Sequence, residues 1–228
     1  RVWVLDADLS AAFDHINHEH LMRAVGHFPG KGMIDGWLKA GVMENGKLSP
    51  TVEGTPQGGV ISPLLLNIAL HGMEEAAGVS RVRQRSGWVL KRDSPAFVRY
   101  ADDFVVLCNT EDQAHRARKG LEEWLAPRGL AFNEEKTRVV HLSEGFDFLE
   151  RSIRRYPNGA LLIRPSKQAV KRAHGRVKDI VRGNRGANPE NMIRSLNSFL
   201  RGWTAYYRPW ASKEAFKDLD HAVFQQLW

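Results

Sequence analysis

Short apolar runs separated by turn-forming residues occupy the first two thirds of the chain, and they predict strands connected by helices and tight turns. Residues 2–5 form an apolar run with the length and β-branching of a buried strand. Residues 97–100 and 104–107 are two such runs on either side of a tight turn, which predicts a hairpin. Further strands are expected in 47–52, 130–142, 146–153 and 160–163, and helices in 20–25, 33–42, 64–73 and from Thr110 to Gly129.

Helical spacing of apolar residues replaces this pattern from about residue 166 onward. The spacing predicts helices at 166–182, 190–207 and 212–227, with breaks between them. The predicted fold class is therefore α+β, and the change of pattern lies between Arg155 and Ser166.

Composition excludes several classes of protein. With 43% hydrophobic and 26% charged residues among 228, the chain is not a disordered one. No stretch approaches 18 apolar residues, so no transmembrane helix is predicted, and no signal peptide is visible. The single cysteine, Cys108, excludes an internal disulfide and fits a reducing compartment. Because the chain opens at Arg1 with a strand-like run, we expect it to be part of a longer protein.

Charge is distributed unevenly along the chain. Residues 1–150 hold 17 basic and 21 acidic residues, and residues 151–228 hold 16 basic and 5 acidic residues. A basic tail behind an acidic body suggests that the tail contacts a polyanion and that the body holds cations. Two solvated surfaces of opposite sign would give the same numbers.

Three acids stand at the ends of predicted apolar strands. Asp8 follows the first strand, and Asp102 and Asp103 occupy the turn of the hairpin. Carboxylates gathered in such surroundings repel one another, and nearby cations offset that cost. A set of oxygen ligands without His or Cys indicates a hard metal, Mg²⁺ before Zn²⁺. Taken alone, an Asp-Asp pair on a turn is ordinary turn chemistry.

Five segments together carry a resemblance to a known family. Residues 97–104 (FVRYADDF) resemble the YADD box of reverse transcriptases, and residues 5–16 resemble their first catalytic box. Residues 54–67 resemble the Pro-Gln-Gly box, 129–137 the lysine-bearing box, and 201–208 the tail of group II intron maturases. The resemblance implies a group II intron-type reverse transcriptase. Residues 1–160 would form the palm, a ferredoxin-like antiparallel sheet packed by helices with a remnant of the fingers. Residues 161–228 would form an all-α three-helix thumb with a maturase-like region.

The resemblance also implies roles for residues of the palm. Asp8, Asp102 and Asp103 would be catalytic and would hold two Mg²⁺ ions, for which Mn²⁺ would substitute, together with the backbone carbonyl of Leu9. Phe13, five residues after Asp8, would lie under the sugar and exclude a 2′-hydroxyl, although a plain core aromatic is the alternative.

Nucleotide and nucleic-acid contacts follow from the same resemblance. Gln57, Gly58 and Lys136 would bind the nucleotide, although a turn and a solvated lysine are the respective alternatives. Basic residues near helical spacing would follow a duplex backbone, or would form a solvated helix face: Lys167, Lys171, Arg172, Arg176, Lys178 and Arg182. Trp203, Tyr206 and Tyr207 are expected in the helical core.

The implied function is RNA-directed DNA synthesis: an RNA template, a DNA or RNA primer and deoxynucleoside triphosphates, with intron RNA as a further partner and no membrane. The implied location is the cytoplasm of a bacterial-type cell, associated with the nucleoid or with RNA. The alternatives are an RNA-binding maturase that mainly assists splicing, a domesticated or CRISPR-associated reverse transcriptase, and an enzyme that makes cyclic nucleotides, against which the Pro-Gln-Gly box argues.

Because the fingers region that precedes this palm in the family is absent, residues 1–228 alone are expected to be weakly active. Glu150 takes a glycine position of the family's primer-grip pattern.

Overall fold

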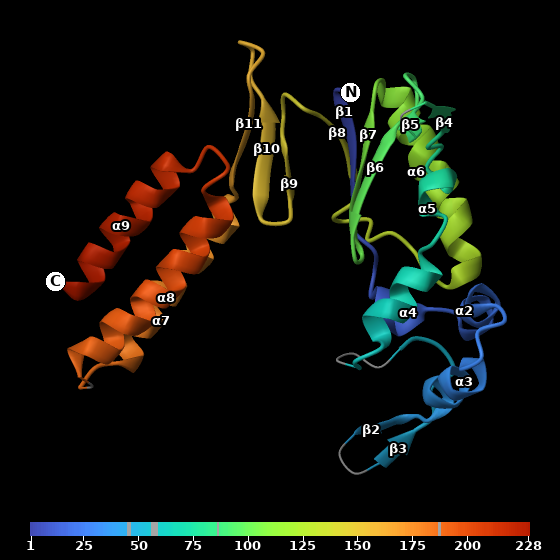
Figure 1. Cartoon of the computed structure of the whole chain (residues 1–228), viewed down its shortest axis with the longest axis horizontal. Coiled ribbons are helices and arrows are strands. Elements are labelled where there is room, and N and C mark those ends of the chain that lie inside the picture. Colours follow the sequence, from blue (N-terminus) through green and yellow to red (C-terminus); the bar gives the residue numbers. More distant parts are fainter. Residues whose placement is uncertain (45–46, 56–58, 86, 187) are drawn as a thin grey trace. The chain divides into compact units, whose positions relative to one another are not determined.

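The computed structural model describes residues 1–44, 47–55, 59–85, 87–186 and 188–228. Its contacts divide the chain into two compact units, Arg1–His141 and Leu142–Trp228. Both units contain antiparallel sheets and helices, which confirms a mixed α and β protein (Figure 1). The predicted palm boundary at residue 160 falls inside the second unit, because the strands on either side of it pair with each other. The assignment of a palm and a thumb stays a prediction.

The largest sheet described in the first unit is four-stranded and antiparallel, in the order β6-β7-β1-β8. The central strands pair from Trp3 opposite Cys108 to Ala7 opposite Phe104. The predicted hairpin is confirmed, with Tyr100 opposite Asp103 across a two-residue turn. The strands are β1 (Trp3–Ala7), β6 (Ala96–Tyr100), β7 (Asp103–Cys108) and β8 (Arg138–His141).

Helices pack against this sheet, and α6 contacts β1, β7 and β8. Thr110 caps α6 as predicted, with its hydroxyl oxygen accepting from the Gln113 backbone N–H at 3.2 Å. The helix predicted at 64–73 is interrupted, because α4 ends at Ala69 and Gly72, with a φ of 97°, is the N-cap of a second helix, α5. The helices are α1 (Ala12–His15), α2 (His18–Val25), α3 (Lys31–Lys39), α4 (Ser62–Ala69), α5 (Met73–Ala76), α6 (Glu111–Leu125) and the 3-10 turn η1 (Ala126–Arg128).

Two small hairpins extend from the first unit. The strand predicted at 47–52 is shorter than expected and ends at Ser49. The hairpin of β4 and β5 was not predicted, because charged residues in β4 hide its alternation. Only the last part of 130–142 forms a strand of the sheet. The hairpins consist of β2 (Val42–Glu44) with β3 (Lys47–Ser49) and of β4 (Arg81–Gln84) with β5 (Gly87–Leu90).

The second unit begins with a three-stranded antiparallel sheet in the order β11-β10-β9. The single strand predicted at 146–153 is wrong, because Leu149 and Glu150 form a tight turn in its middle. Both turn residues have positive φ angles, 47° and 64°, which glycine or asparagine would adopt more easily. The strands are β9 (Phe146–Phe148), β10 (Arg151–Arg155) and β11 (Leu161–Pro165).

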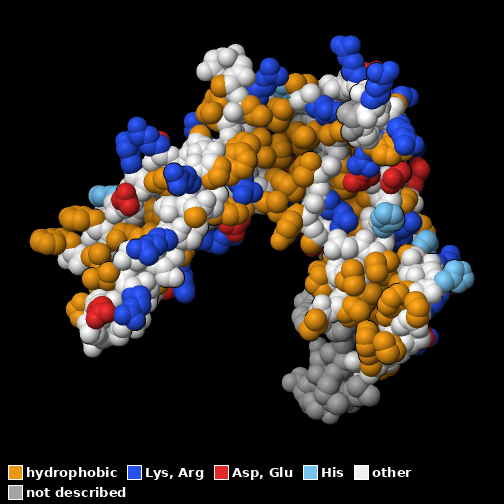
Figure 2. Space-filling view, in the orientation of Figure 1, with side chains coloured by type: hydrophobic (Ala, Val, Ile, Leu, Met, Phe, Trp, Pro, Cys, Tyr) orange, Lys and Arg blue, Asp and Glu red, His pale blue; other side chains and the backbone are white. Residues whose placement is uncertain are grey.

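The three helices predicted for the tail are confirmed. They are α7 (Lys167–Gly183), α8 (Pro189–Tyr207) and α9 (Lys213–Leu227). Their shared core contains Ala173, Val177, Ile180, Leu196 and Leu219. Lys and Arg side chains stand out on the surface of these helices (Figure 2).

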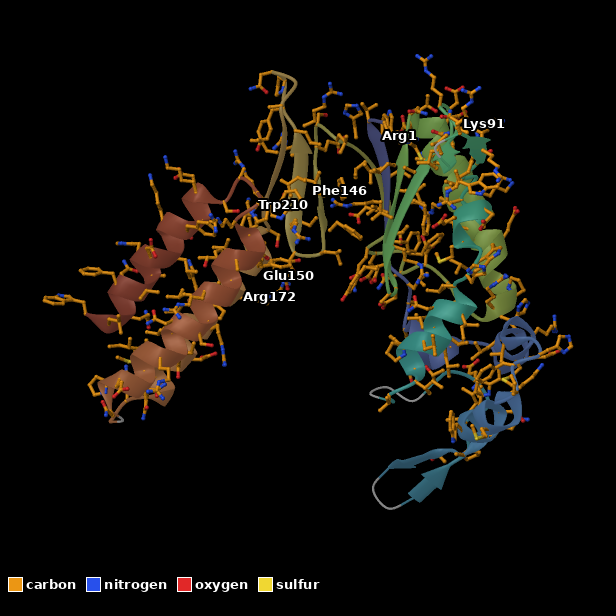
Figure 3. The ribbon with its side chains drawn as sticks, viewed as in Figure 1. Arg1, Lys91, Phe146, Glu150, Arg172 and Trp210 are labelled. Atoms are coloured by element: carbon orange, nitrogen blue, oxygen red, sulfur yellow. The ribbon has the colours of Figure 1, made fainter. Side chains whose placement is uncertain are left out.

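Glu150 joins the tip of the β9–β10 hairpin to two helices, and Figure 3 shows it beside Arg172. Its carboxylate accepts from Arg172 of α7 at 2.6 Å and from the Tyr207 hydroxyl of α8 at 3.2 Å. Burial, followed by the charge of Glu150, raises the pKa of Tyr207 to about 12. The Glu150 carboxylate therefore holds the β9–β10 turn against α7 and α8.

None of the described helices is long and apolar enough to cross a lipid bilayer.

Candidate active site

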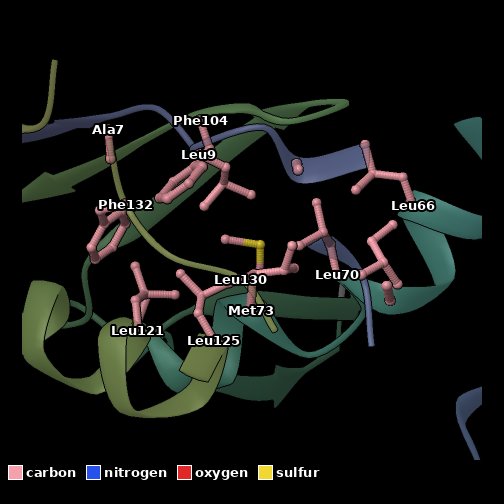
Figure 4. Packing of buried hydrophobic residues seen from close by; sticks show 14 of the residues in the cluster. Ala7, Leu9, Leu66, Leu70, Met73, Phe104, Leu121, Leu125, Leu130 and Phe132 are labelled. Carbon is pink, nitrogen blue, oxygen red and sulfur yellow. The ribbon is translucent and has the colours of Figure 1, made fainter. Parts of the chain in front are cut away.

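The three predicted acids lie at one end of β1 and β7, the two central strands of the four-stranded sheet. The register places Ala7, the last residue of β1, opposite Phe104, so Asp8 follows the end of β1 beside Asp103, the first residue of β7. Asp102 is the second residue of the two-residue turn before β7. Beneath this edge, Ala7, Leu9 and Phe104 pack into the hydrophobic core (Figure 4). Residues almost a hundred positions apart are thereby brought to one end of the sheet.

The carboxylates are close enough to influence one another. The pKa of Asp103 is raised, chiefly by partial burial and then by the negative charges of Asp102 and Asp8, whereas Lys136 acts in the opposite direction. A carboxyl that resists ionisation beside two others indicates a site of concentrated negative charge.

Lys136 reaches this site from the segment that precedes β8. Its Nζ donates to Asp8 Oδ2 at 2.8 Å, and this contact raises the pKa of Lys136. The loop is held in place because the Asn133 backbone N–H donates to the Asp8 carbonyl at 2.8 Å. The prediction of a nucleotide-binding Lys136 remains untested, and the structure adds a carboxylate partner that the sequence did not reveal.

Leu9 forms an antiparallel bridge with Phe132. The hydrogen bonds of this bridge come from its neighbours, including Ser10 N–H to the Ala131 carbonyl at 3.0 Å. In such a pair the backbone groups of the opposed residues point away from each other. The Leu9 carbonyl is therefore directed away from Phe132, as a carbonyl ligand of a bound ion would need to be.

Phe13 lies in α1, partly buried against the core of the first unit. Its carbonyl accepts from the backbone N–H of Thr55 at 2.6 Å, which ties the first box to the start of the Pro-Gln-Gly box. Both the sugar-gate prediction and the core alternative are compatible with this position. The predicted nucleotide-binding residues Gln57 and Gly58 lie outside the described residues.

Gly54 lies close against the backbone of the first box. Its φ is +78°, and a Cβ there would lie 2.5 Å from the carbonyl oxygen of Asp14. Replacement of Gly54 by alanine is expected to lower the free energy of unfolding by about 2–4 kcal/mol, from left-handed strain and overpacking. Urea denaturation measures this. Gly36→Ala is the control, because a Cβ on Gly36 meets no atom within 4 Å, and equal midpoints for the two variants would contradict the expectation.

Arg99 supports the hairpin turn and was missed by the sequence analysis. Its Nη1 donates to the Ala101 carbonyl at 2.8 Å and to Asn67 Oδ1 of α4 at 2.7 Å. The Ala101 φ of 55° places a non-glycine residue in the left-handed region directly before Asp102. The one available signal was Asn67 itself, a polar residue inside an otherwise apolar run.

The predicted basic residues of the tail all lie on α7, with exposed side chains: Lys167, Lys171, Arg172, Arg176, Lys178 and Arg182. The buried face of the same helix contains Ala169, Ala173 and Val177. Arg172 is paired with Glu150, whereas none of the other five forms an ion pair within the described part of the chain. Binding of nucleic acid by these residues stays a prediction.

The three aromatic residues near the end of α8 differ in burial. Tyr207 is 1% exposed and Trp203 is partly buried, as a core position requires. The core prediction is wrong for Tyr206, which is 44% exposed. The Tyr206 hydroxyl donates to the Leu149 carbonyl at 3.2 Å, and the Arg151 guanidinium lies 4.3 Å from the centre of its ring. Tyr206 therefore faces the β9–β10 hairpin. Helical spacing alone does not show whether an aromatic residue faces such a hairpin or the helical core.

The donor chemistry of the candidate site fits a hard divalent cation. Within the described ranges, no group of three or more His, Cys, Asp or Glu side chains is already arranged around a common point. However, the three acids offer only oxygen, and the ammonium group of Lys136 already neutralises one of them at 2.8 Å. A site whose acids repel one another and accept a cation suits Mg²⁺.

The raised pKa of Asp103 predicts a pH-dependent effect on stability. Because the folded state holds this proton more tightly than the unfolded chain, ionisation of Asp103 destabilises the fold as the pH rises. Asp103→Asn is expected to raise Tm at pH 7, and the difference should vanish below about pH 4. Thermal melts at both pH values measure it. The control Asp112→Asn removes an acid that is paired with Arg116, so it should not raise Tm; a rise equal to that of Asp103→Asn would contradict the explanation.

Comparison with known families gives two matches that follow each other along the chain. The family described as reverse transcriptase (RNA-dependent DNA polymerase) matches residues 1–153. The family described as group II intron, maturase-specific domain matches residues 170–228.

Individual relatives agree with these matches. Protein YkfC of Escherichia coli is 34% identical over 176 residues, covering 64% of this chain and 45% of YkfC. The group II intron-encoded protein LtrA of Lactococcus lactis is 31% identical over 145 residues, covering 61% of this chain and 23% of LtrA. The chain thus spans less than half the length of these curated relatives.

Solved structures support the fold. Telomerase from Candida albicans, solved with a fragment of telomeric RNA, has a TM-score of 0.53 at 14% identity and covers 99% of this chain and 44% of that one. Its likeness, at this identity, is one of fold, and it is consistent with a polymerase palm-type fold. Since a family match covers more than half of its residues and a maturase-specific segment follows, the chain belongs to the reverse transcriptase family and is of the group II intron reverse transcriptase/maturase type.

Proposed function

We propose that this chain is the catalytic part of an RNA-directed DNA polymerase that extends a primer 3′ end on an RNA template. The observation that carries the proposal is the meeting of Asp8 with the Asp102–Asp103 turn, where burial and then the charges of the other two acids raise the pKa of Asp103. Residues 1–160 would serve as the palm and residues 161–228 as the thumb.

The three carboxylates, with the Leu9 carbonyl, would hold two Mg²⁺ ions, and Mn²⁺ would substitute. When bound, such ions supply the positive charge that favours deprotonation of the 3′-hydroxyl and stabilises the leaving pyrophosphate. The core beneath Asp8 and Asp103 keeps these ligands in place, and Arg99 holds the Ala101 carbonyl beside Asp102. Lys136, which is hydrogen-bonded to Asp8, would stabilise the leaving pyrophosphate by its charge or donate a proton to it.

Selection of the nucleotide would rest on residues near the first box. Phe13 would place its ring against the sugar, which leaves no room for a 2′-hydroxyl and favours deoxynucleotides. Gln57 and Gly58 would contact the nucleotide or the template. Gly54 and Thr55, which precede them, are hydrogen-bonded to the segment that carries Phe13.

The exposed basic residues of α7 would bind the nucleic-acid backbone: Lys167, Lys171, Arg176, Lys178 and Arg182, with Arg172 shared with Glu150. Such contacts release counterions from the phosphates, and the entropy gained by this release falls as the salt concentration rises, so binding should weaken with ionic strength. Template RNA, a DNA or RNA primer and intron RNA would be the partners, in the cytoplasm of a bacterial-type cell.

A second candidate is a maturase that mainly helps intron RNA to fold, either alone or together with DNA synthesis. The match of residues 170–228 to the maturase-specific domain favours it. Splicing rescue by a variant without the acids would distinguish the two, because rescue persists if RNA binding is the main task.

The test is the double variant Asp102→Asn/Asp103→Asn in the full-length protein, assayed on poly(rA)/oligo(dT). We expect primer extension to fall by at least about 10³-fold, because the charges that would hold the ions are lost while the turn keeps its shape. Binding of the primer–template should stay within a few fold. Unchanged extension would refute the proposal.

A further inference from the structure

A cavity of about 400 Å³ lies in the first unit between α2, α4 and η1, and none of the three acids lines it. Leu21 and Ile68 supply apolar wall, and His20, Asn67, His71 and Arg128 supply polar groups. This size is within the range of about 300–1,000 Å³ that small-molecule sites occupy, and the mixture of apolar walls with a few polar groups is typical of them.

Arg128 carries the one permanent charge among the described residues that line the cavity. The Arg128 guanidinium lies 3.4 Å from the centre of the Trp124 ring and donates to the Trp124 carbonyl at 2.6 Å. Among the described residues Arg128 has no carboxylate partner, and none of the lining residues is acidic. Burial lowers the pKa of Arg128, and burial followed by the Arg128 charge lowers the pKa of His20. An anion placed here would offset both costs.

We propose that this cavity binds a small organic anion with a planar apolar body and a phosphate or carboxylate head. The body would lie against Ala24 and Ile68, and the head would accept hydrogen bonds from Arg128 and the two imidazoles. Stacking on Trp124 holds the Arg128 guanidinium in one orientation, so little side-chain freedom remains to be lost on binding. The proposal does not depend on the polymerase activity.

Asn67 connects the cavity with the support of the hairpin turn. Its Oδ1 accepts from Arg99, which also holds the Ala101 carbonyl. The side-chain NH₂ of Asn67 is therefore the group that would donate to the anion. The site is thus bordered by the same side chain that fixes the turn before Asp102.

Phenyl phosphate is the probe, titrated into the 228-residue chain while the imidazole proton signals of His20 and His71 are followed by NMR. His20→Gln and His71→Gln identify the two signals. We expect saturable shifts and a raised pKa of His20, because a nearby anion favours the imidazolium. Inorganic phosphate has only the anionic head of the probe, and phenol has only its ring. Each should bind at least about tenfold more weakly than phenyl phosphate.

Two variants test the site independently. Arg128→Gln removes the charge, and Ala24→Phe fills the cavity from α2 while keeping Arg128. Each should weaken phenyl phosphate at least about tenfold, and the control Arg116→Gln on α6 should bind within about twofold of the unchanged chain. If Arg128→Gln does not fold, Ala24→Phe decides. Absence of any shift at His20 and His71 up to about 10 mM probe, or unchanged affinity in Ala24→Phe, would overturn the proposal.

Discussion

Asp8→Asn in the full-length protein is expected to reduce primer extension by at least about 10³-fold. Asparagine keeps the shape of the side chain but removes the charge that lies beside the hairpin turn and that contributes to the raised pKa of Asp103. Steady-state extension of a labelled primer measures the loss, which should appear in kcat with little change in primer–template affinity. The Lys136 ammonium also loses its anionic partner.

Asp6→Asn is the matched control for this substitution. Asp6 lies on the same strand, two residues earlier, and its Oδ2 accepts from Arg138 at 3.2 Å. Its replacement should cost some stability and leave extension within about tenfold of the unchanged protein. If both variants lose activity equally, the effect belongs to the strand and not to the carboxylate of Asp8.

Phe13→Ala should produce the second large effect, on the choice of nucleotide. With the ring removed, a ribonucleotide would no longer meet it at its 2′-hydroxyl, and discrimination against ribonucleotides should fall about 10–100-fold. The ratio of kcat/KM for a deoxynucleotide and the matching ribonucleotide measures this. Phe13→Tyr keeps the ring and should keep the discrimination.

Loss of packing must be separated from loss of the gate. Phe97→Ala serves this purpose, because Phe97 is another partly buried aromatic residue against the same core. It should lower stability without changing the ratio of the two substrates. If Phe97→Ala and Phe13→Ala lose discrimination equally, the effect comes from lost core packing and the sugar-gate role of Phe13 is contradicted.

Much of the fold could be predicted because its elements are locally encoded. The apolar runs that became β1, β6 and β7 have the length and the β-branching of buried strands, and the turn between β6 and β7 is marked by polar residues. Thr110 marks the start of α6, and the helical spacing of apolar residues predicts the ends of α7, α8 and α9 to within a few residues. These signals depend on neighbours along the chain and need no knowledge of the tertiary structure.

Several contacts that the sequence did not reveal depend on groups that are distant along the chain. Lys136 reaches Asp8, and Arg99 reaches Asn67, only because strands and helices bring them together. The turn at Leu149 and Glu150 carries no turn-forming residue, and it is stabilised by Arg172 and Tyr207 from two later helices. Local propensity is overridden there by tertiary contacts.

Paramagnetic broadening by Mn²⁺ tests most directly whether Asp8 and the 102–103 turn share a cation site. In amide spectra of the 228-residue chain, the earliest broadening should affect residues 7–9 and 101–104 together, and it should be lost in Asp8→Asn and in Asp102→Asn alike. Competition by Mg²⁺ should restore the signals. Broadening of only one of the two segments, or broadening that persists in both variants, would contradict a shared site.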